Sequence, residues 1–405
     1  MGVIETDIVI VGAGISGLAT SLGLHRLGIK SLVLEASDQL RASGYALTLW
    51  SNAWRALDAL GIGASLRQQH IQIFEFVATS LTSRKRTAEI NLRATRKHGE
   101  QEVSCVSRKV LLEALAKDLP QGTIRYSSKL VHIEDSGNHK LAHLADGTIV
   151  KTKVLVGCDG VNSLVASWLG LSKTAYAGRS NLRGFANFEN EHNYGKKSLQ
   201  YYGEGIRAGF VPCDEKSVYW FLTYIPSRKT SGMEHDPTRM KQYATDKLQN
   251  IDEYMKPAIQ NTSPDSIISS PLQYRHPWEF LTRSISKGNV CVAGDAFHPM
   301  TPEISQGGCA ALEDGLVLAR CIAQALKATD INEYKRIEIG LGKYAKERRW
   351  RGFQLVSTAY VVGWIQVGRW KVTRYFRDKF LSPYLADLLL KSSDFDCGTG
   401  KLIVS

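Results

Sequence analysis

Three glycines near the start of the chain carry the clearest chemical signal. They follow an apolar strand, residues 8–11, and precede a helix-like segment with apolar residues at 18, 22, 24 and 27. The turn reads Gly12-Ala13-Gly14-Ile15-Ser16-Gly17. The first glycine permits the tight turn, the second lets a pyrophosphate approach the backbone, and the third lets the helix pack closely. The free N–H groups and positive dipole end of the helix favour phosphate. The pattern therefore predicts a dinucleotide site.

An acid closes this unit and narrows the choice of nucleotide. The second strand, residues 31–34, ends in Glu35, eighteen positions after Gly17. An acid at this place accepts hydrogen bonds from a ribose 2′-OH and repels a 2′-phosphate. The site therefore suits FAD or NAD and not NADP. The alternative is a degenerate nucleotide-binding unit that is kept only for its fold.

Size and composition set the class of protein. The chain has 405 residues, of which 43% are hydrophobic, and this predicts a large core and two structural domains. Seven scattered cysteines without a CxxC pair argue against a disulfide framework or a zinc site and suit a reducing compartment. The first strand begins almost at Met1, so we expect no targeting segment and a cytoplasmic protein, the alternative being an organellar leader trimmed upstream. The apolar stretch 359–368 is shorter than the about 20 residues of a membrane span.

The net charge of +12 is concentrated in two places. Residues 335–379 hold twelve Lys and Arg against three acids, and residues 83–97 hold six against one. Such patches suit an anionic membrane or a phosphorylated cosubstrate, with a solvated helix face as the alternative. Peripheral membrane contact through the basic C-terminal region is thus one prediction. Nucleic acid is not expected, because no nucleic-acid-binding motif is present.

Two further segments follow strands of the buried type. Residues 154–156 lead into Cys158-Asp159-Gly160-Val161-Asn162-Ser163, and residues 290–292 lead into Ala293-Gly294-Asp295-Ala296-Phe297-His298-Pro299. Ligands bind outside the carboxyl ends of such strands in doubly wound sheets. Farther on, Pro302 and the pair Gly307-Gly308 precede a long helical pattern, and this pair can offer N–H groups to a ligand.

Together the three segments resemble those of the class A flavoprotein monooxygenases, which are built like p-hydroxybenzoate hydroxylase. The resemblance runs from residue 4 to about residue 380 and looks closest to plant salicylate-hydroxylase-like and zeaxanthin-epoxidase-like members. It implies an α/β fold: a Rossmann-type FAD-binding domain, an inserted antiparallel β-sheet substrate domain and a C-terminal helical region. The predicted boundaries are 1–171 and 286–330 for the FAD-binding domain, 172–285 for the substrate domain and 331–405 for the basic helical region.

The resemblance also implies roles for individual residues. Asp295 contacts the ribityl chain of FAD, Pro302 lies beside the flavin face, and Arg41 and Arg108 match arginines placed against FAD. His298 has a structural role in this block, with a general base as the alternative. The predicted cofactor-binding residues are Gly12, Gly14, Ile15, Ser16, Gly17, Glu35, Arg41, Arg108, Asp159, Gly160, Gly294, Asp295, Pro302, Gly307 and Gly308.

The activity that the resemblance implies is monooxygenation. NADPH or NADH reduces FAD, O₂ adds at the flavin C4a position, and the resulting hydroperoxide transfers one oxygen atom to an aromatic or isoprenoid substrate. No catalytic residue and no metal is assigned. Candidates for the substrate site lie on the aromatic strands, where alternation directs about half of them elsewhere. They are Arg183, Tyr201, Tyr202, Phe210, Tyr219, Trp220 and Phe221. Of these, Tyr201, Tyr219 and Phe221 are the predicted substrate residues.

The chain departs from the family pattern at two positions, and two other functions are considered for it. The family's Arg after the second motif is Ala166 here, and the glycine before the last helix is Ser305. A flavin-dependent halogenase is one rival, but both tryptophans of its WxWxIP signature are missing at residues 221–226. The other rival is a flavin-free lipid- or prenyl-binding escort protein on a relic Rossmann fold. The motif around Asp295 argues against this second rival.

Overall fold

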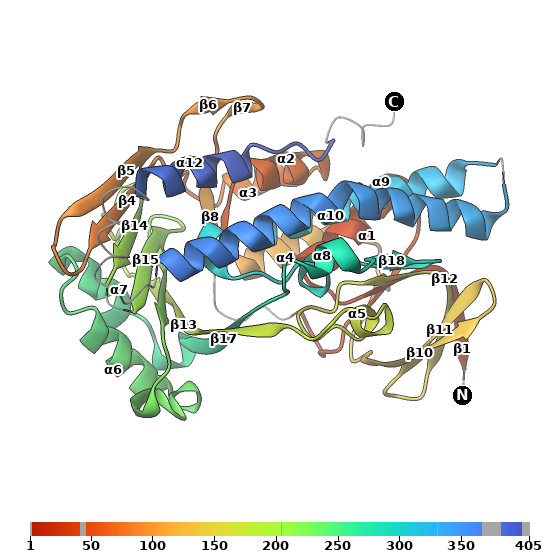
Figure 1. The fold of residues 1–405 in the computed structure, drawn as a ribbon, viewed down its shortest axis with the longest axis horizontal. Helices are drawn as coiled ribbons and strands as arrows, with labels where there is room; N and C mark the ends of the chain where they lie inside the picture. Colours follow the sequence, from red (N-terminus) through yellow and green to blue (C-terminus); the bar gives the residue numbers. More distant parts are fainter. Residues whose placement is uncertain (1, 41–45, 204, 330, 367–381, 399–405) are drawn as a thin grey trace.

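Two large β-sheets, two small two-stranded sheets and a layer of long helices make up the described part of the protein (Figure 1). The computed structural model describes residues 2–40, 46–203, 205–329, 331–366 and 382–398. Arg41, a predicted FAD ligand, and residues 367–381 of the basic region lie outside the described residues. The fold class expected from the sequence is confirmed: a Rossmann-type sheet, an antiparallel substrate sheet and C-terminal helices.

The first sheet is built around the buried half of strand β1 (Val3–Val11). Parallel strands flank it, and an antiparallel hairpin extends it. The parallel strands are β2 (Leu32–Leu34), β9 (Ile124–Arg125), β12 (Ile149–Gly157) and β19 (Val290–Val292). The antiparallel ones are β10 (Leu130–Ser136), β11 (His139–Leu144) and β18 (Ser286–Lys287). Strands covered on both faces read as continuous apolar runs, which is the pattern of residues 8–11, 154–156 and 290–292.

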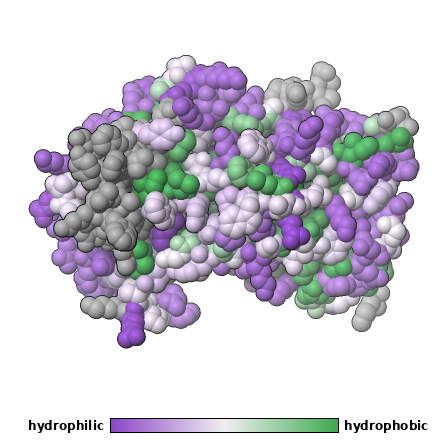
Figure 2. Space-filling view, in the orientation of Figure 1, coloured by the Kyte–Doolittle hydropathy of each residue, from purple (hydrophilic) through white to green (hydrophobic). Residues whose placement is uncertain are grey.

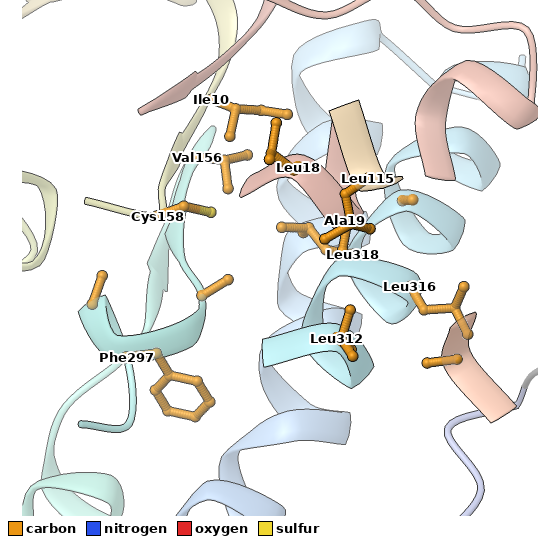
Figure 3. Close-up of a cluster of buried hydrophobic side chains, with 14 of the residues drawn as sticks. Ile10, Leu18, Ala19, Leu115, Val156, Cys158, Phe297, Leu312, Leu316 and Leu318 are labelled. Carbon is orange, nitrogen blue, oxygen red and sulfur yellow. The ribbon is translucent and has the colours of Figure 1, made fainter. Parts of the chain in front are cut away.

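Helices α1 (Ile15–Arg26) and α9 (Gly307–Lys327) pack against each other beside this sheet, and glycines set how closely they approach. A Cβ at Gly315 would lie 2.6 Å from the Cβ of Ala19 and 2.8 Å from the backbone N of Thr20. A Cβ at Gly23 would lie 2.8 Å from the Cβ of Ala319. Leu18 of α1 lies beside Ile10 of β1 and Val156 of β12, and leucines of α9 belong to the same core (Figure 3).

The second sheet is antiparallel except for one parallel pair, β14 with β4. Its order is β17 (Ile268–Tyr274), β13 (Ala175–Asn187), β16 (Ser217–Tyr224), β15 (Ile206–Pro212), β14 (Lys197–Tyr202), β4 (Glu75–Ser80) and β5 (Arg86–Asn91). Helices α6 (Pro237–Lys247) and α7 (Lys256–Gln260) cover one face. Strands β4 and β5 come from residues that the predicted boundary at 172 assigned to the nucleotide-binding domain. The chain therefore enters this sheet earlier than predicted.

The other face of the second sheet turns toward the first domain. Val211, Tyr219 and Phe221 belong to the same apolar core as β1 and α1. The Sγ atoms of Cys213 and Cys105 lie 3.2 Å apart, which brings the sheet against strand β8 (Ser104–Ser107). All seven cysteines are buried free thiols, and no group of three or more His, Cys, Asp or Glu could hold a metal ion within the residues the structure describes.

Short elements connect these layers. They are β3 (Ala46–Leu49), which pairs with β8, α2 (Ser51–Ala59), α3 (Gly63–Arg67), β6 (Thr95–Arg96), β7 (Gly99–Glu100), α4 (Arg108–Lys117), α5 (Leu164–Trp168) and α8 (Glu279–Thr282).

The C-terminal helices α10 (Glu333–Gln366) and α12 (Ser382–Ser393) lie across the first domain, with α10 packed on α9. The inner side of α10 buries Ile337, Leu341 and Tyr344, whereas Trp350 and Trp364 are 64% and 67% exposed. Figure 2 shows this face, on which apolar and polar side chains are interspersed. Among the described residues, none of the helices combines the length and apolar character needed to cross a bilayer.

The contact between α1 and α9 generates a stability prediction. Gly315→Ala places a methyl group against Ala19 and should lower the free energy of unfolding by about 1–3 kcal/mol. Gly342→Ala in α10, where an added Cβ meets no atom within 4 Å, should raise it by up to about 1 kcal/mol. Urea unfolding of both variants measures the difference, and equal effects would show that the helix contact is looser than described.

Candidate functional site

Two helix N-termini lie next to each other at the carboxyl edge of the first sheet. Helix α1 begins at Ile15 and α9 begins at Gly307, and neither has a side-chain cap. A Cβ at Gly308 would lie 3.6 Å from Cδ1 of Ile15, so the two helix ends are neighbours. The first N–H groups of a helix have no partner within it, and its dipole makes this end positive. The arrangement suits a ligand that is anionic or electron-rich at two points.

The glycines of the turn before α1 differ in their surroundings. Gly12 has φ +102°, and a Cβ there would lie 2.4 Å from the carbonyl oxygen of Cys158. A Cβ at Gly17 would lie 2.0 Å from the carbonyl oxygen of Gly12. Gly14, in contrast, has no atom of the described residues within 4 Å of the place of a Cβ. Gly12 and Gly17 thus hold the turn together, and Gly14 leaves a bare approach for a pyrophosphate, as a dinucleotide requires.

Glu35 closes the turn from the end of β2. Its Oε2 accepts a hydrogen bond from the N–H of Ala13 (2.9 Å), and its Oε1 accepts one from the N–H of Ser37 (2.9 Å). Each oxygen of a carboxylate can accept more than one hydrogen bond. This buried acid therefore positions the glycine turn. It also lies where the sequence predicts a contact with the ribose.

Asp159 lies beside Gly12, but its carboxylate accepts hydrogen bonds from groups at the start of helix α5. Oδ2 accepts the N–H of Leu164 (2.8 Å), and Oδ1 accepts the hydroxyl of Ser163 (2.5 Å). The backbone, and not the charge, of Asp159 thus borders the glycine turn. Gly160 follows with φ +79°. Ala166, which stands where the family has Arg, is buried, and its N–H donates to Oγ of Ser163 (2.8 Å).

Asp295 lies where β19 ends, beside the start of α1. Gly294 has φ +60°, and a Cβ there would lie 2.8 Å from the Cβ of Ser16. Solvent reaches the side chain of Asp295, yet protein surrounds it closely enough that desolvation raises its pKa, while His298, Arg108 and Arg183 oppose that rise. Asp295 is thus an exposed acid that protein surrounds closely, and the cations Arg108 of α4 and Arg183 of β13 lie near enough for their charges to act on it.

A buried ion cluster lies next to the segment that carries Asp295. Oδ2 of Asp314 accepts the N–H of Gly294 (2.8 Å) and bonds Nε2 of His298 (2.6 Å), while Oδ1 accepts Nε of Arg348 (2.7 Å). One carboxylate thus fixes the backbone before Asp295 and the histidine after it. His298 is fully buried, which supports the structural role and not the general base.

The neighbouring Glu313 extends the cluster to three elements. It accepts hydrogen bonds from Arg348 (2.6 Å), from Arg351 (3.0 Å) and from the amide of Asn52 in α2 (2.6 Å). Burial raises the pKa of both carboxyls, but the cationic partners outweigh it, and both pKa values end below their ordinary range. The cluster ties α2 and α10 to α9 at the point where α9 begins.

The sequence could not have located the partners of this cluster. Two adjacent acids on an apolar helix signal that buried cations must exist. These cations are Arg348 and Arg351. They come from a basic segment for which the sequence predicts a solvated helix face or a membrane contact. Two of the cations of that segment are in fact buried in ion pairs.

Ser305 occupies a position where the family usually has glycine, and its backbone has a conformation that favours glycine. Its φ is +51°, which costs an L-residue about 1–2 kcal/mol. It ends the short helical turn of residues 302–304, which begins at half-buried Pro302. Glu303 in this turn accepts from Arg179 of β13 (2.5 Å), and Arg179 also donates to the carbonyl of Gly363 (3.1 Å). The loop before α9 is thus held by the second sheet and by α10.

The aromatic candidates on the second sheet divide between its faces. Tyr219 and Phe221 pack with the core of the first domain, and by strand alternation Arg183 and Tyr202 share their face. The others pack under the helices: Tyr201, Phe210 and Trp220. The hydroxyl of Tyr201 donates to Asp252 (2.8 Å). Tyr201 therefore belongs to the core on the helix side, which corrects its prediction as a substrate residue.

Comparisons with known proteins agree with this geometry. Residues 5–359 match the family described as FAD binding domain. Monooxygenase 2 of Arabidopsis thaliana is 51% identical over 97% of this chain and 98% of its own length. Monooxygenase 1 of the same plant is 36% identical over 97% of this chain and 99% of its own length.

Solved structures show the same fold. Klebsiella pneumoniae HpxO complexed with FAD and uric acid superposes with a TM-score of 0.83 at 21% identity and covers 96% of each chain. The tetrameric form of 2-methyl-3-hydroxypyridine-5-carboxylic acid oxygenase has a TM-score of 0.74 at 17% identity and covers 98% of each chain.

Asp295 yields a prediction for cofactor binding. Asp295→Asn keeps the size of the side chain but removes its charge, and hydrogen bonds to a charged group contribute about 1.5–3 kcal/mol. FAD should therefore dissociate about 10- to 100-fold more readily, as measured by fluorescence titration of the apoprotein. Asp246→Asn on the exposed side of α6 is the matched control and should bind FAD as the wild type does. Unchanged affinity of Asp295→Asn would remove this residue from the site.

The ion cluster yields a pH prediction. Because the folded pKa values of Glu313 and Asp314 lie below the ordinary 4.5 and 3.8, their contribution to stability is present above these values and is lost as pH falls through the folded pKa values. Arg348→Met leaves buried acids uncompensated and should cost about 3–5 kcal/mol at pH 7. The difference from wild type should shrink below about pH 4, when the acids take up protons.

Chemical unfolding between pH 3 and pH 8 measures this prediction. Lys343→Met, at an exposed position of the same helix, serves as the control and should track the wild type throughout. A constant difference between Arg348→Met and wild type at every pH would mean that the arginine acts by packing and not by its charge.

Proposed function

This chain belongs to the family of FAD-binding class A flavin monooxygenases, and we propose that it uses NAD(P)H and O₂ to hydroxylate or epoxidise an aromatic or olefinic small molecule. Bound FAD supplies hydride acceptance and oxygen activation. The protein binds and orients the reactants and keeps water away from them. A flavin-free escort protein does not agree with the family, and the halogenase signature is missing at residues 221–226.

One observation supports the proposal most strongly: Asp295 stands between the two halves of the site. Its backbone is held beside the start of α1, and the charge of Arg183, on the second sheet, acts on its carboxyl. A ligand that contacts Asp295 is therefore near both the glycine turn and the substrate sheet. A flexible dinucleotide with a polar chain in its middle has the length and chemistry to span this path.

Each part of the site then has a role toward FAD. The N–H groups at the start of α1, beside Gly14, would hold the pyrophosphate. Asp295 would accept hydrogen bonds from the ribityl hydroxyls. The N–H groups of Gly307 and Gly308 would stabilise negative charge on the bound flavin. Arg108 would offset the charge of Asp295 and of the phosphates.

The substrate site lies between the start of α9 and the second sheet. Tyr219 and Phe221 form an aromatic pair on this face, with ring centroids 6.1 Å apart. Flat apolar rings favour a planar or unsaturated substrate, and burial of the reacting carbon keeps water from the reaction. Since the chain has one GxGxxG motif, the nicotinamide binds transiently and without a Rossmann unit of its own.

Anaerobic stopped-flow spectroscopy tests the reductant and the substrate class. The holoenzyme is mixed with NADH or NADPH, alone and with phenols, quinones and isoprenoids, and flavin absorbance is followed. We expect one nicotinamide to bleach the flavin and one compound class to accelerate the bleaching. With ¹⁸O₂, one labelled oxygen atom should then appear in the product of that compound. If neither nicotinamide bleaches the flavin under any condition, or if the product is unlabelled, the proposed reaction is wrong.

A further inference from the structure

The outer side of helix α10 carries a stripe of apolar and basic residues. They are spaced three or four apart, as residues on one face of a helix are, and comprise Ile339, Lys343, Lys346, Trp350 and Phe353. Ile339 is 50% exposed and Trp350 is 64% exposed, and both lysines are exposed as well. Exposed apolar residues that gather at one place mark an interaction surface, whereas single ones do not.

Helix α8 lies beside the middle of α10 and widens this stripe (Figure 1). Trp278, at the start of α8, and Leu281 within it are 58% and 55% exposed. Arg349 of α10 ties the two helices together, because its guanidinium donates hydrogen bonds to the carbonyl oxygens of Phe280 and Leu281. Trp278, Leu281 and the stripe of α10 thus form one surface, the α8–α10 face.

A groove of about 450 Å³ lies in the α8–α10 face. The rings of Trp350 and Phe353, which line it, stack with their centroids 5.0 Å apart. Gly342 also lines the groove, and a Cβ there would meet no atom of the described residues within 4 Å. Lys346 and Arg349 add cations to this apolar lining. A ligand with an apolar part and an anionic part matches both kinds of residue.

The charge that the α8–α10 face presents is positive. Lys343 and Lys346 point outward, whereas Arg348 and Arg351 of the same helix are buried in ion pairs. Each acid of the two helices is paired with a cation: Glu279 with Arg275, Glu333 with Lys153, Glu338 with Lys335 and Glu347 with Arg320. A partner of negative charge therefore complements this face.

Tryptophan beside lysine suits the boundary between lipid and water. The indole ring enters the apolar layer while its N–H stays hydrated, and lysine reaches anionic headgroups with its long stem in the apolar layer. A second copy of this chain across a twofold axis would instead bring lysine against lysine. Contact with a membrane would be made at its surface, since no described helix is long and apolar enough to cross one.

We propose that the α8–α10 face docks on a bilayer that contains anionic lipids. Trp278, Leu281 and Trp350 enter the headgroup region, Lys343 and Lys346 contact the anionic headgroups, and the groove receives part of a lipid chain. Membrane contact, which the sequence predicts for the whole basic region, is thereby assigned to the outward residues of α8 and α10. This inference goes beyond the proposed function and does not depend on it.

Co-sedimentation of the FAD-loaded enzyme with lipid vesicles tests the proposal. The vesicles contain phosphatidylcholine alone or with phosphatidylserine, at low and at high salt. We expect binding to the vesicles with phosphatidylserine, weakened by salt. A variant with both Lys343→Gln and Lys346→Gln should bind about 10- to 30-fold more weakly, because each lysine near an anionic surface contributes about fivefold. Lys117→Gln with Lys129→Gln, at exposed positions outside this face, changes the net charge equally and should bind as the wild type does.

A second measurement locates the side chains that enter the bilayer. Brominated phosphatidylcholine, mixed with phosphatidylserine, quenches the fluorescence of tryptophans that reach its chains. A variant with Trp278→Phe and Trp350→Phe should lose most of this quenching, whereas Trp168→Phe, outside the face, should keep it. The FAD content and thermal midpoint of each variant, which should match those of the wild type, show that the protein is folded.

Three outcomes would overturn the proposal. They are absence of binding to vesicles with phosphatidylserine, equal binding to both kinds of vesicle, and an equal loss of binding in the two lysine variants. If the enzyme ignores vesicles but self-associates in analytical ultracentrifugation, and Trp350→Ala abolishes this, the face belongs to a second copy. Because none of these readouts needs turnover, they hold or fail independently of the nicotinamide experiment.

Discussion

The close packing of α1 on α9 is the constraint on which the rest of the structure depends. Gly315 and Gly23 let the two helices approach until backbone and methyl groups touch, and this contact brings Ile15 beside Gly308. Two positive helix ends thus meet at one edge of the sheet, although almost three hundred residues separate them. A bulkier residue at the contact would move one end away from the other. The same ligand could then no longer reach both.

Buried charge holds the second half of this arrangement. Asp314 binds the backbone of Gly294 and the ring of His298, and with Glu313 it anchors Arg348 and Arg351 of α10. Such pairs contribute little net stability when compared with apolar packing, but they allow only one geometry. The short helical turn before α9 contains Glu303, which forms an ion pair with Arg179, and ends at Ser305, whose φ is unfavourable for an L-residue. The segments around Asp295 and Pro302 are therefore held by groups of α9, of α10 and of the second sheet.

Local patterns in the sequence predicted the parts of this site. They could not predict which residues far apart in the sequence would pair with one another. The glycine turn, Glu35 and Asp295 are found because strand, turn and helix signals surround them within a few residues. The partners Arg348, Arg351 and Asn52 come from distant elements, and nothing in their neighbourhood marks them as buried. Alternation predicted that about half of the aromatic residues would leave the substrate face, but not that Tyr201 would be among them, since register depends on the pairing of β14 with β15 and β4.

The central claim is that a single FAD joins both helix ends and passes Asp295. A crystal structure of the FAD-loaded enzyme measures this directly, through the distances from the phosphate oxygens to the N–H groups at the start of α1 and from the pyrimidine edge to those of Gly307 and Gly308. We expect both sets to fall within hydrogen-bonding range, about 2.7–3.2 Å. Density for the pyrophosphate away from Gly14, or for the ring away from the start of α9, would contradict the account.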